Sequence, residues 1–174
     1  SMSRKEPRAD IQAALTVIGR RAPDKIALER HKGFRLDLRA ADLRSADLRG
    51  GDFAQAGFFR SNFQFAGLIG TNLEGASLMG ANLSDAHLYQ TRFDAITDLE
   101  DTTFDKAMVF NTDFSTTDLT QEQLSQMFAG GGTPVPHGLT RPTHWPDQTL
   151  PYGEFWNAYE AWRGDQHPTP PPKS

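Results

Sequence analysis

Side chains able to do chemistry are sparse in this sequence, and few of them lie close together. Of five histidines, only His137 and His144, with Asp147 nearby, are close enough in sequence to suggest a metal site. They lie in a proline-rich stretch, without a cysteine and without the i, i+4 spacing by which a helix presents two ligands. We therefore expect no bound metal.

The aspartates are numerous, and a pair of carboxylates could serve as general acid and base. Seven of the fifteen, such as Asp42 and Asp47, recur at a fixed interval before a large apolar residue, so the repetition itself explains them. Nor does the chain contain the G-x-x-x-x-G-K-[ST] loop that holds nucleotide phosphates. We expect no enzyme activity and no cofactor. Glycines recur after the apolar residue, where a corner needs permissive backbone angles, at positions 50, 70, 75 and 80.

The composition favours a reducing compartment and does not favour a filled globular core. Only 37% of the 174 residues are hydrophobic, and cysteine is absent, which excludes disulfides and thiolate chemistry. The chain has neither a stretch of about eighteen apolar residues nor a signal sequence, so we expect a cytoplasmic protein without membrane contact. The net charge of -4 is uneven: residues 1–34 hold eight Lys/Arg against four acids, whereas residues 84–118 hold eight acids against two bases.

Large apolar residues recur every five positions, and this repeat dominates the chain. The series is interrupted once, by a single inserted residue between Phe93 and Leu99. Its seventeen members, which we call the core ladder, are Leu38, Leu43, Leu48, Phe53, Phe58, Phe63, Leu68, Leu73, Leu78, Leu83, Leu88, Phe93, Leu99, Phe104, Val109, Phe114 and Leu119.

A small residue lies two positions before each ladder residue, with Leu36 as the exception. A period of five matches neither an α-helix nor a simple strand. Two residues spaced by two do share one side of an extended segment, so each unit reads as a short extended side followed by a corner. Four such units close one coil. Seventeen units then give about four coils and a rod about 20 Å long, since stacked strands lie about 4.8 Å apart.

The segments A-D-L-R-S-A-D-L-R-G at 41–50 and A-S-L-M-G-A-N-L-S-D at 76–85 resemble the A-(D/N)-L-x-x repeat of the pentapeptide-repeat family. The resemblance covers residues 36–119. It implies an all-β solenoid, a right-handed quadrilateral parallel β-helix. The lead-in at 10–21 and the segment G-L-T-R-P-T-H-W-P at 138–146 also resemble flanks of bacterial members.

The flanks are predicted to form short α-helical caps, because an open β-helix exposes unpaired strand edges at both ends. Residues 1–34 hold a helix at 7–18 and a basic lead-in, and the β-helix spans 35–119. Thr120 and Gln123 predict a capping box that opens a capping helix over 120–130. Residues 131–174 form a Pro/Gly-rich tail with an expected disordered end. Its helix, at 152–163, carries the aromatic face Tyr152, Phe155, Trp156, Tyr159 and Trp162.

The residue after each ladder residue points outward, and every fourth one stacks into a column. Two columns are polar. The Phe59 column comprises Arg39, Phe59, Met79 and Glu100, and the Tyr89 column comprises Arg49, Ile69, Tyr89 and Phe110. Ile69, Tyr89 and Phe110 form an apolar stripe that needs a cover. The C-terminal aromatic helix, a second copy of the chain or an outside partner could each supply it.

We interpret the chain as a non-enzymatic scaffold for protein–protein interaction, with its protein partner unidentified and a homodimer as one option. The family resemblance implies an alternative, a DNA-mimicking modulator of a type II topoisomerase such as gyrase, which the acidic stretch Asp85–Asp118 favours. A third reading is a soluble domain of a larger, membrane-tethered protein. Direct nucleic-acid binding is not expected, because Arg39, Arg44 and Arg49 each follow an aspartate two residues earlier and can pair with it.

Overall fold

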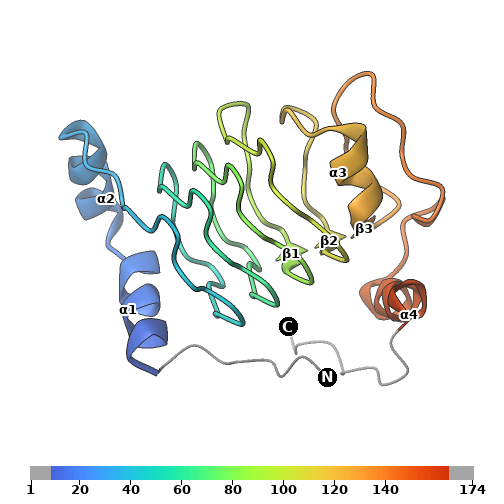
Figure 1. Cartoon of the computed structure of the whole chain (residues 1–174), viewed down its shortest axis with the longest axis horizontal. Helices are drawn as coiled ribbons and strands as arrows, with labels where there is room; N and C mark the ends of the chain where they lie inside the picture. Colours follow the sequence, from blue (N-terminus) through green and yellow to red (C-terminus); the bar gives the residue numbers. More distant parts are fainter. Residues whose placement is uncertain (1–8, 165–174) are drawn as a thin grey trace.

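The repeat region coils into an elongated stack in which the chain pairs with itself one turn later. The structure, a computed structural model, describes residues 9–164 (Figure 1). Parallel β-bridges join residues 20 apart, from Asp37↔Gly57 to Asn72↔Arg92. After the inserted residue the separation becomes 21, as in Ser77↔Asp98. Each turn of the stack therefore consumes four five-residue units, and the insertion is absorbed within one turn.

One column of the stack is regular enough to form a parallel sheet. β1 (His87–Tyr89) pairs with β2 (Met108–Phe110), which pairs with β3 (Phe128–Ala129). This order places residues of three successive turns side by side, with Leu88 opposite Val109 and Val109 opposite Ala129. The outward residues of β1 are His87 and Tyr89, and those of β2 are Met108 and Phe110.

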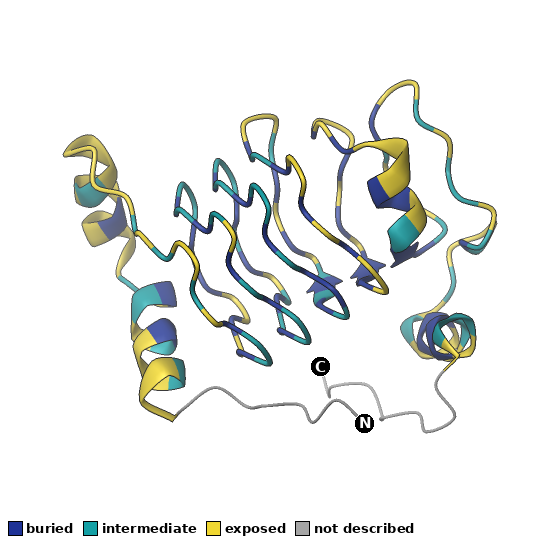
Figure 2. Ribbon diagram, in the orientation of Figure 1, coloured by how far each residue is buried: buried dark blue, intermediate teal, exposed yellow. Residues whose placement is uncertain are grey.

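The core ladder lies inside the stack. Buried positions recur along the turns of the coil in Figure 2. All its members are buried except Leu38, which is partly exposed on the first turn. From Ala46 onward the small residues beside them are also buried. Hydroxyls among them bond to the preceding turn: Thr71 Oγ1 donates to the Leu48 carbonyl at 2.8 Å and Thr102 Oγ1 to the Leu78 carbonyl at 2.8 Å. These hydroxyls are therefore satisfied in an apolar interior.

Two helices lie at the N-terminal end, where the sequence predicts one. α1 (Ala9–Gly19) buries Leu15 and Gly19 against the first turn. The expected start near Pro7 lies outside the described residues. α2 (Pro23–His31) falls within the basic lead-in and was not predicted, because it buries only Ile26 and so shows no apolar periodicity. Its start is favoured by Pro23, whose fixed φ suits a first helical position.

The helix predicted over 120–130 is shorter in the structure. Thr120 and Gln123 form the capping box, but α3 (Gln121–Gln126) ends there and Met127 is extended. The expectation for 127–130 was wrong because Phe128 and Ala129 pair with β2 as β3, so the Phe128 and Gly130 amides donate to the carbonyls of Ala107 and Val109 instead of to a helical turn. α4 (Tyr152–Arg163) follows and spans the predicted range. The expected disordered end of the tail lies outside the described residues.

Candidate interaction surfaces

The Tyr89 column is an aromatic surface that the parallel sheet positions. Because β1 and β2 pair in register, Tyr89 and Phe110 lie one turn apart and their rings meet edge to face, with centroids separated by 5.5 Å. Phe128 continues the apolar surface from β3. Side chains on neighbouring parallel strands lie close enough for such contacts at every turn.

α4 lies across this surface and buries its aromatic face there. Tyr152 stacks on Tyr89, with ring centroids 5.6 Å apart and an interplanar angle of 23°. Phe155 packs against Phe110, with ring centroids 4.7 Å apart. The Tyr159 hydroxyl donates to the Lys106 carbonyl at 2.9 Å. Burial raises the pKa of Tyr152. The structure thus brings the predicted aromatic helix together with two of the three residues of the predicted stripe.

An ion pair at the C-terminal end of α4 adds to this docking. Arg163 Nη2 lies 3.0 Å from Asp85 Oδ1, and both side chains are largely buried. Burial raises the pKa of Asp85, and the Arg163 charge opposes that rise. A buried pair of this kind is costly to break from one side, because one charge is then left without its counterion.

His144 takes part in the same docking and Trp145 packs into the core cluster of the rod, two contacts that sequence reasoning missed. The His144 ring stacks on Trp162 with centroids 5.0 Å apart and planes within 5°, and His144 Nε2 lies 2.8 Å from the Met127 carbonyl. Trp145 Nε1 donates to the same carbonyl. His144 therefore packs against α4, away from any metal cluster: among residues 9–164 no group of three or more histidines and acids is placed to hold a metal ion. The sequence did offer one signal that this proline-rich loop packs against the rest of the chain, namely the large apolar side chain of Trp145.

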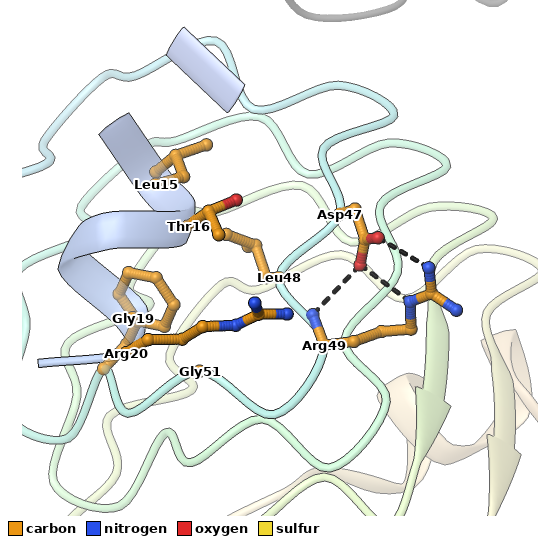
Figure 3. A pocket seen from close by; sticks show the side chains of 9 residues that line it. Leu15, Thr16, Gly19, Arg20, Asp47, Leu48, Arg49 and Gly51 are labelled. Carbon is orange, nitrogen blue, oxygen red and sulfur yellow. Dashed lines mark hydrogen bonds and ion pairs between the residues drawn. The ribbon is translucent and has the colours of Figure 1, made fainter. Parts of the chain in front are cut away.

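Ile69, the third residue of the stripe, lies outside both hydrophobic clusters of the described residues. It lines a cleft of about 200 Å³ with Asp47, Gly67 and His87. A second cleft, of about 300 Å³, opens between α1 and the first turns and is shown in Figure 3. Its walls include Leu15, Leu48 and Arg20, and Arg49 turns aside to pair with Asp47. Neither cleft gathers a set of groups suited to catalysis.

The Phe59 column remains open in the structure. Phe59 and Met79 are half-buried, and neither belongs to a hydrophobic cluster of the described residues. The Arg60 guanidinium lies 4.9 Å from the Phe59 ring centroid, a cation–π contact. Because the columns repeat every fourth unit, the Phe59 column lies two columns from the Tyr89 column. Of the two apolar columns, α4 covers one.

The arginines of the first turn pair as the sequence predicts. Nη2 of Arg39, Arg44 and Arg49 lies 2.6, 2.6 and 2.7 Å from the aspartate two residues earlier. The Arg39 side chain holds the pKa of Asp37 below its usual value, and Arg49 does the same for Asp47. These pairs are exposed, so they contribute little stability.

Comparison with known proteins identifies the repeat. The family model described as "Pentapeptide repeats" matches eight copies, over residues 37–75 and 58–94. Residues 37–94 of the chain are pentapeptide repeats. No curated protein gives a significant match. No described helix of this pentapeptide-repeat protein has the length and apolarity needed to cross a membrane.

Solved structures similar to this pentapeptide-repeat protein are themselves pentapeptide-repeat proteins or a drug-resistance protein. Rfr23 from the cyanobacterium Cyanothece 51142 is 22% identical over 57% of this chain and 63% of its own, with a TM-score of 0.38. A pentapeptide repeat protein of the Arabidopsis thaliana thylakoid lumen is 20% identical over 59% and 70%, with a TM-score of 0.36. QnrB1, a plasmid-mediated fluoroquinolone resistance protein, is 15% identical over 75% and 70%, with a TM-score of 0.33.

Proposed function

We propose that this pentapeptide-repeat protein is a non-enzymatic scaffold that binds a protein through the Phe59 column. The observation that supports this is the difference between the two apolar columns: α4 packs on Tyr89 and Phe110, whereas Phe59 and Met79 lie outside the hydrophobic clusters of the described residues. Aligned apolar side chains on a rigid surface are typical of a contact site for another macromolecule.

The scaffold is proposed to be a right-handed, four-sided β-helix closed by helical caps. Bridges at 20 or 21 residues and left-handed corners every five residues support four sides. The capping role is supported by glutamines that imitate peptide groups at the edges. Gln12 Oε1 accepts from the Asp47 amide at 2.8 Å, and Gln12 Nε2 donates to the Asp47 carbonyl at 2.7 Å. Gln123 Nε2 donates to the Leu99 carbonyl at 2.8 Å.

Photo-crosslinking tests the proposed surface directly. A benzophenone amino acid placed at Met79 should capture a discrete protein adduct when the full chain is expressed in its host. The matched control carries the same group at Gln64, which occupies the equivalent outward position in a polar column, and should capture little. Equal labelling from both positions, or none from Met79, would contradict a binding role for the Phe59 column.

The acidic end of the rod supports a second proposal, the topoisomerase modulator implied by the family resemblance. Glu100, Asp101, Asp118 and Glu122 surround one cleft of about 430 Å³. Clustered carboxylates can compete with DNA for a basic groove. A gyrase supercoiling assay with purified protein tests this: inhibition or protection from a quinolone should weaken when Asp101 and Asp118 are changed to asparagine. No effect at micromolar protein excludes this function.

A further inference from the structure

The Phe59 column is basic at one end, apolar in the middle and acidic at the other end, so two copies running in opposite directions would match in charge. Along the rod it runs Arg39, Phe59, Met79 and Glu100, each one turn from the next. A turn is about 4.8 Å, so the basic and acidic ends are separated by about 14 Å. Turned end over end, the column presents Glu100 where Arg39 was and Met79 where Phe59 was.

The residues around the column carry the same polarity. Exposed Arg35 lies at the basic end, beside Asp37 and Arg39. At the other end Asp98 and Asp101 flank Glu100. Between the ends, the outward neighbours of Phe59 and Met79 are Gly57 and Ser77, which leave room for side chains of a second surface. The Arg60 guanidinium lies over the Phe59 ring and Asp37 pairs with Arg39 at the basic end, so the surface changes from mainly basic through apolar to acidic along one direction.

We propose that two copies of the chain associate through their Phe59 columns, antiparallel, about a two-fold axis perpendicular to the rods. This inference rests on the proposed function, since it takes the Phe59 column as a protein-binding surface and names its occupant. Antiparallel packing places Arg39 opposite Glu100 of the second copy and Phe59 opposite its Met79. Parallel packing would instead place Glu100 and Asp101 against the same acids. A two-fold interface needs this kind of self-complementary surface.

Arg39 can form the intermolecular pair without giving up Asp37. Its Nε donates to Asp37 Oδ1 at 2.8 Å and its Nη2 to Asp37 Oδ2 at 2.6 Å. A guanidinium has five N–H donors, so those on Nη1 remain for an incoming carboxylate. The existing pair also fixes the direction of the side chain, which lowers the entropy cost of the second contact.

The size of the surface indicates a weak dimer. Four turns extend the column over about 15–20 Å, and a strip one strand wide buries less than the ~800 Å² per partner of a standard interface. Because the area is small, the charge pairs decide register and specificity more than affinity. Association is expected in the micromolar range or weaker, and at low salt.

Sedimentation velocity of the full chain over tens of micromolar to millimolar concentration tests the proposal. Wild type should associate reversibly, and Arg39→Glu or Glu100→Arg should each weaken dimerisation about tenfold. Combining both reversals should restore it to near the wild-type value, because the swapped charges again face each other. The same reversals in a polar column, Arg44→Glu and Asp105→Arg, should leave dimerisation unchanged. Thermal melting verifies that each variant is folded.

A wild-type chain that stays monomeric at every concentration would overturn the dimer, and so would a double reversal that fails to recover association. The crosslinking experiment separates this from the proposed function. If the purified chain is monomeric while the group at Met79 captures a different protein in the host, the inference fails and the scaffold function stands. If neither self-association nor capture occurs, both fail.

Discussion

The corners of the coil are where single residues carry the largest conformational cost. The residue two positions after a ladder residue has a left-handed φ at most turns, near 65° at Gly50, Gly70, Gly75 and Gly80. Elsewhere the same angle is adopted by side chains such as Arg60 at 56° and Lys106 at 57°. Left-handed backbone costs a non-glycine residue about 1 kcal/mol or more. Backbone hydrogen bonds between neighbouring turns, beside the corners, offset this cost.

The corner with the inserted residue is held by Asp94 instead. Asp94 Oδ1 accepts hydrogen bonds from the Gly75 amide at 2.9 Å, the Ile96 amide at 3.2 Å and the Thr97 hydroxyl at 2.9 Å. Burial alone would raise the pKa of Asp94, but these hydrogen bonds outweigh it and lower the pKa. The corner with the inserted residue is therefore held by hydrogen bonds to the Asp94 carboxylate.

Asp94→Ala should destabilise the fold by about 1–3 kcal/mol at neutral pH, because the Ile96 amide loses its acceptor and the Gly75 amide keeps only the contact to Thr97 Oγ1 at 3.2 Å. Since the folded pKa is lowered, the stabilisation is present above the unfolded value of about 3.9 and is lost as the pH falls through the folded pKa. Urea denaturation at pH 7 and pH 3 measures both effects. Asp118→Ala, at an exposed acid, should change stability by less than about 0.5 kcal/mol. An equal loss at both pH values would contradict this role.

At the scale of elements, α4 is the helix whose position depends most on side-chain contacts. Its residues Phe155, Trp156 and Tyr159 are buried against Phe110, Phe128 and Met108. The buried Arg163–Asp85 pair anchors its last turn. A twelve-residue helix is marginal by itself in water, so its stability comes from this packing.

Tyr89→Asp should undock α4, because it removes the ring under Tyr152 and buries a charge beside Phe110. We expect a loss of about 2 kcal/mol or more and faster proteolysis between residues 131 and 164. The control Gln64→Asp lies at the same outward position in a polar column and should have neither effect. If melting temperature and protection of the tail both stay unchanged, docking of α4 on the Tyr89 column is wrong.

At the scale of the whole molecule, the rod behaves as a one-dimensional stack in which each turn contacts only its neighbours. In such stacks, stability is close to a sum of terms for each turn and each contact between turns. Leu78 lies in the interior with no exposed surface, whereas Leu38 is partly exposed on the first turn. The same change should therefore cost different amounts along one column of the core.

Leu78→Ala should cost about 2–5 kcal/mol, because the tight interior cannot collapse around the cavity. Leu38→Ala should cost about 1 kcal/mol, in keeping with partial burial. Thermal and urea unfolding of the two variants beside wild type compare them. Equal losses at both positions would show that the first turn is as tightly packed as the middle of the rod.

Much of this arrangement follows from spacing alone. The inward ladder and its parallel stacking follow from the period of five, the paired small and large residues and the corner glycines. Each unit repeats one local geometry, so a geometry inferred for one unit holds for the next. The Arg39–Asp37 pair was predictable for the same reason, since the two residues share one side of a short extended segment. The range of α4 was predictable from its aromatic face.

Contacts between distant segments were decided only by the tertiary structure. The sequence left three possible covers for the Tyr89 column, and in the structure α4 covers it, with His144 stacked on Trp162 of that helix. Likewise β3 forms where a helix was predicted, because an open strand edge at β2 offers hydrogen bonds that local propensity does not register. Local patterns specify local geometry, but a nonlocal contact depends on which unpaired edge or apolar surface the chain can reach.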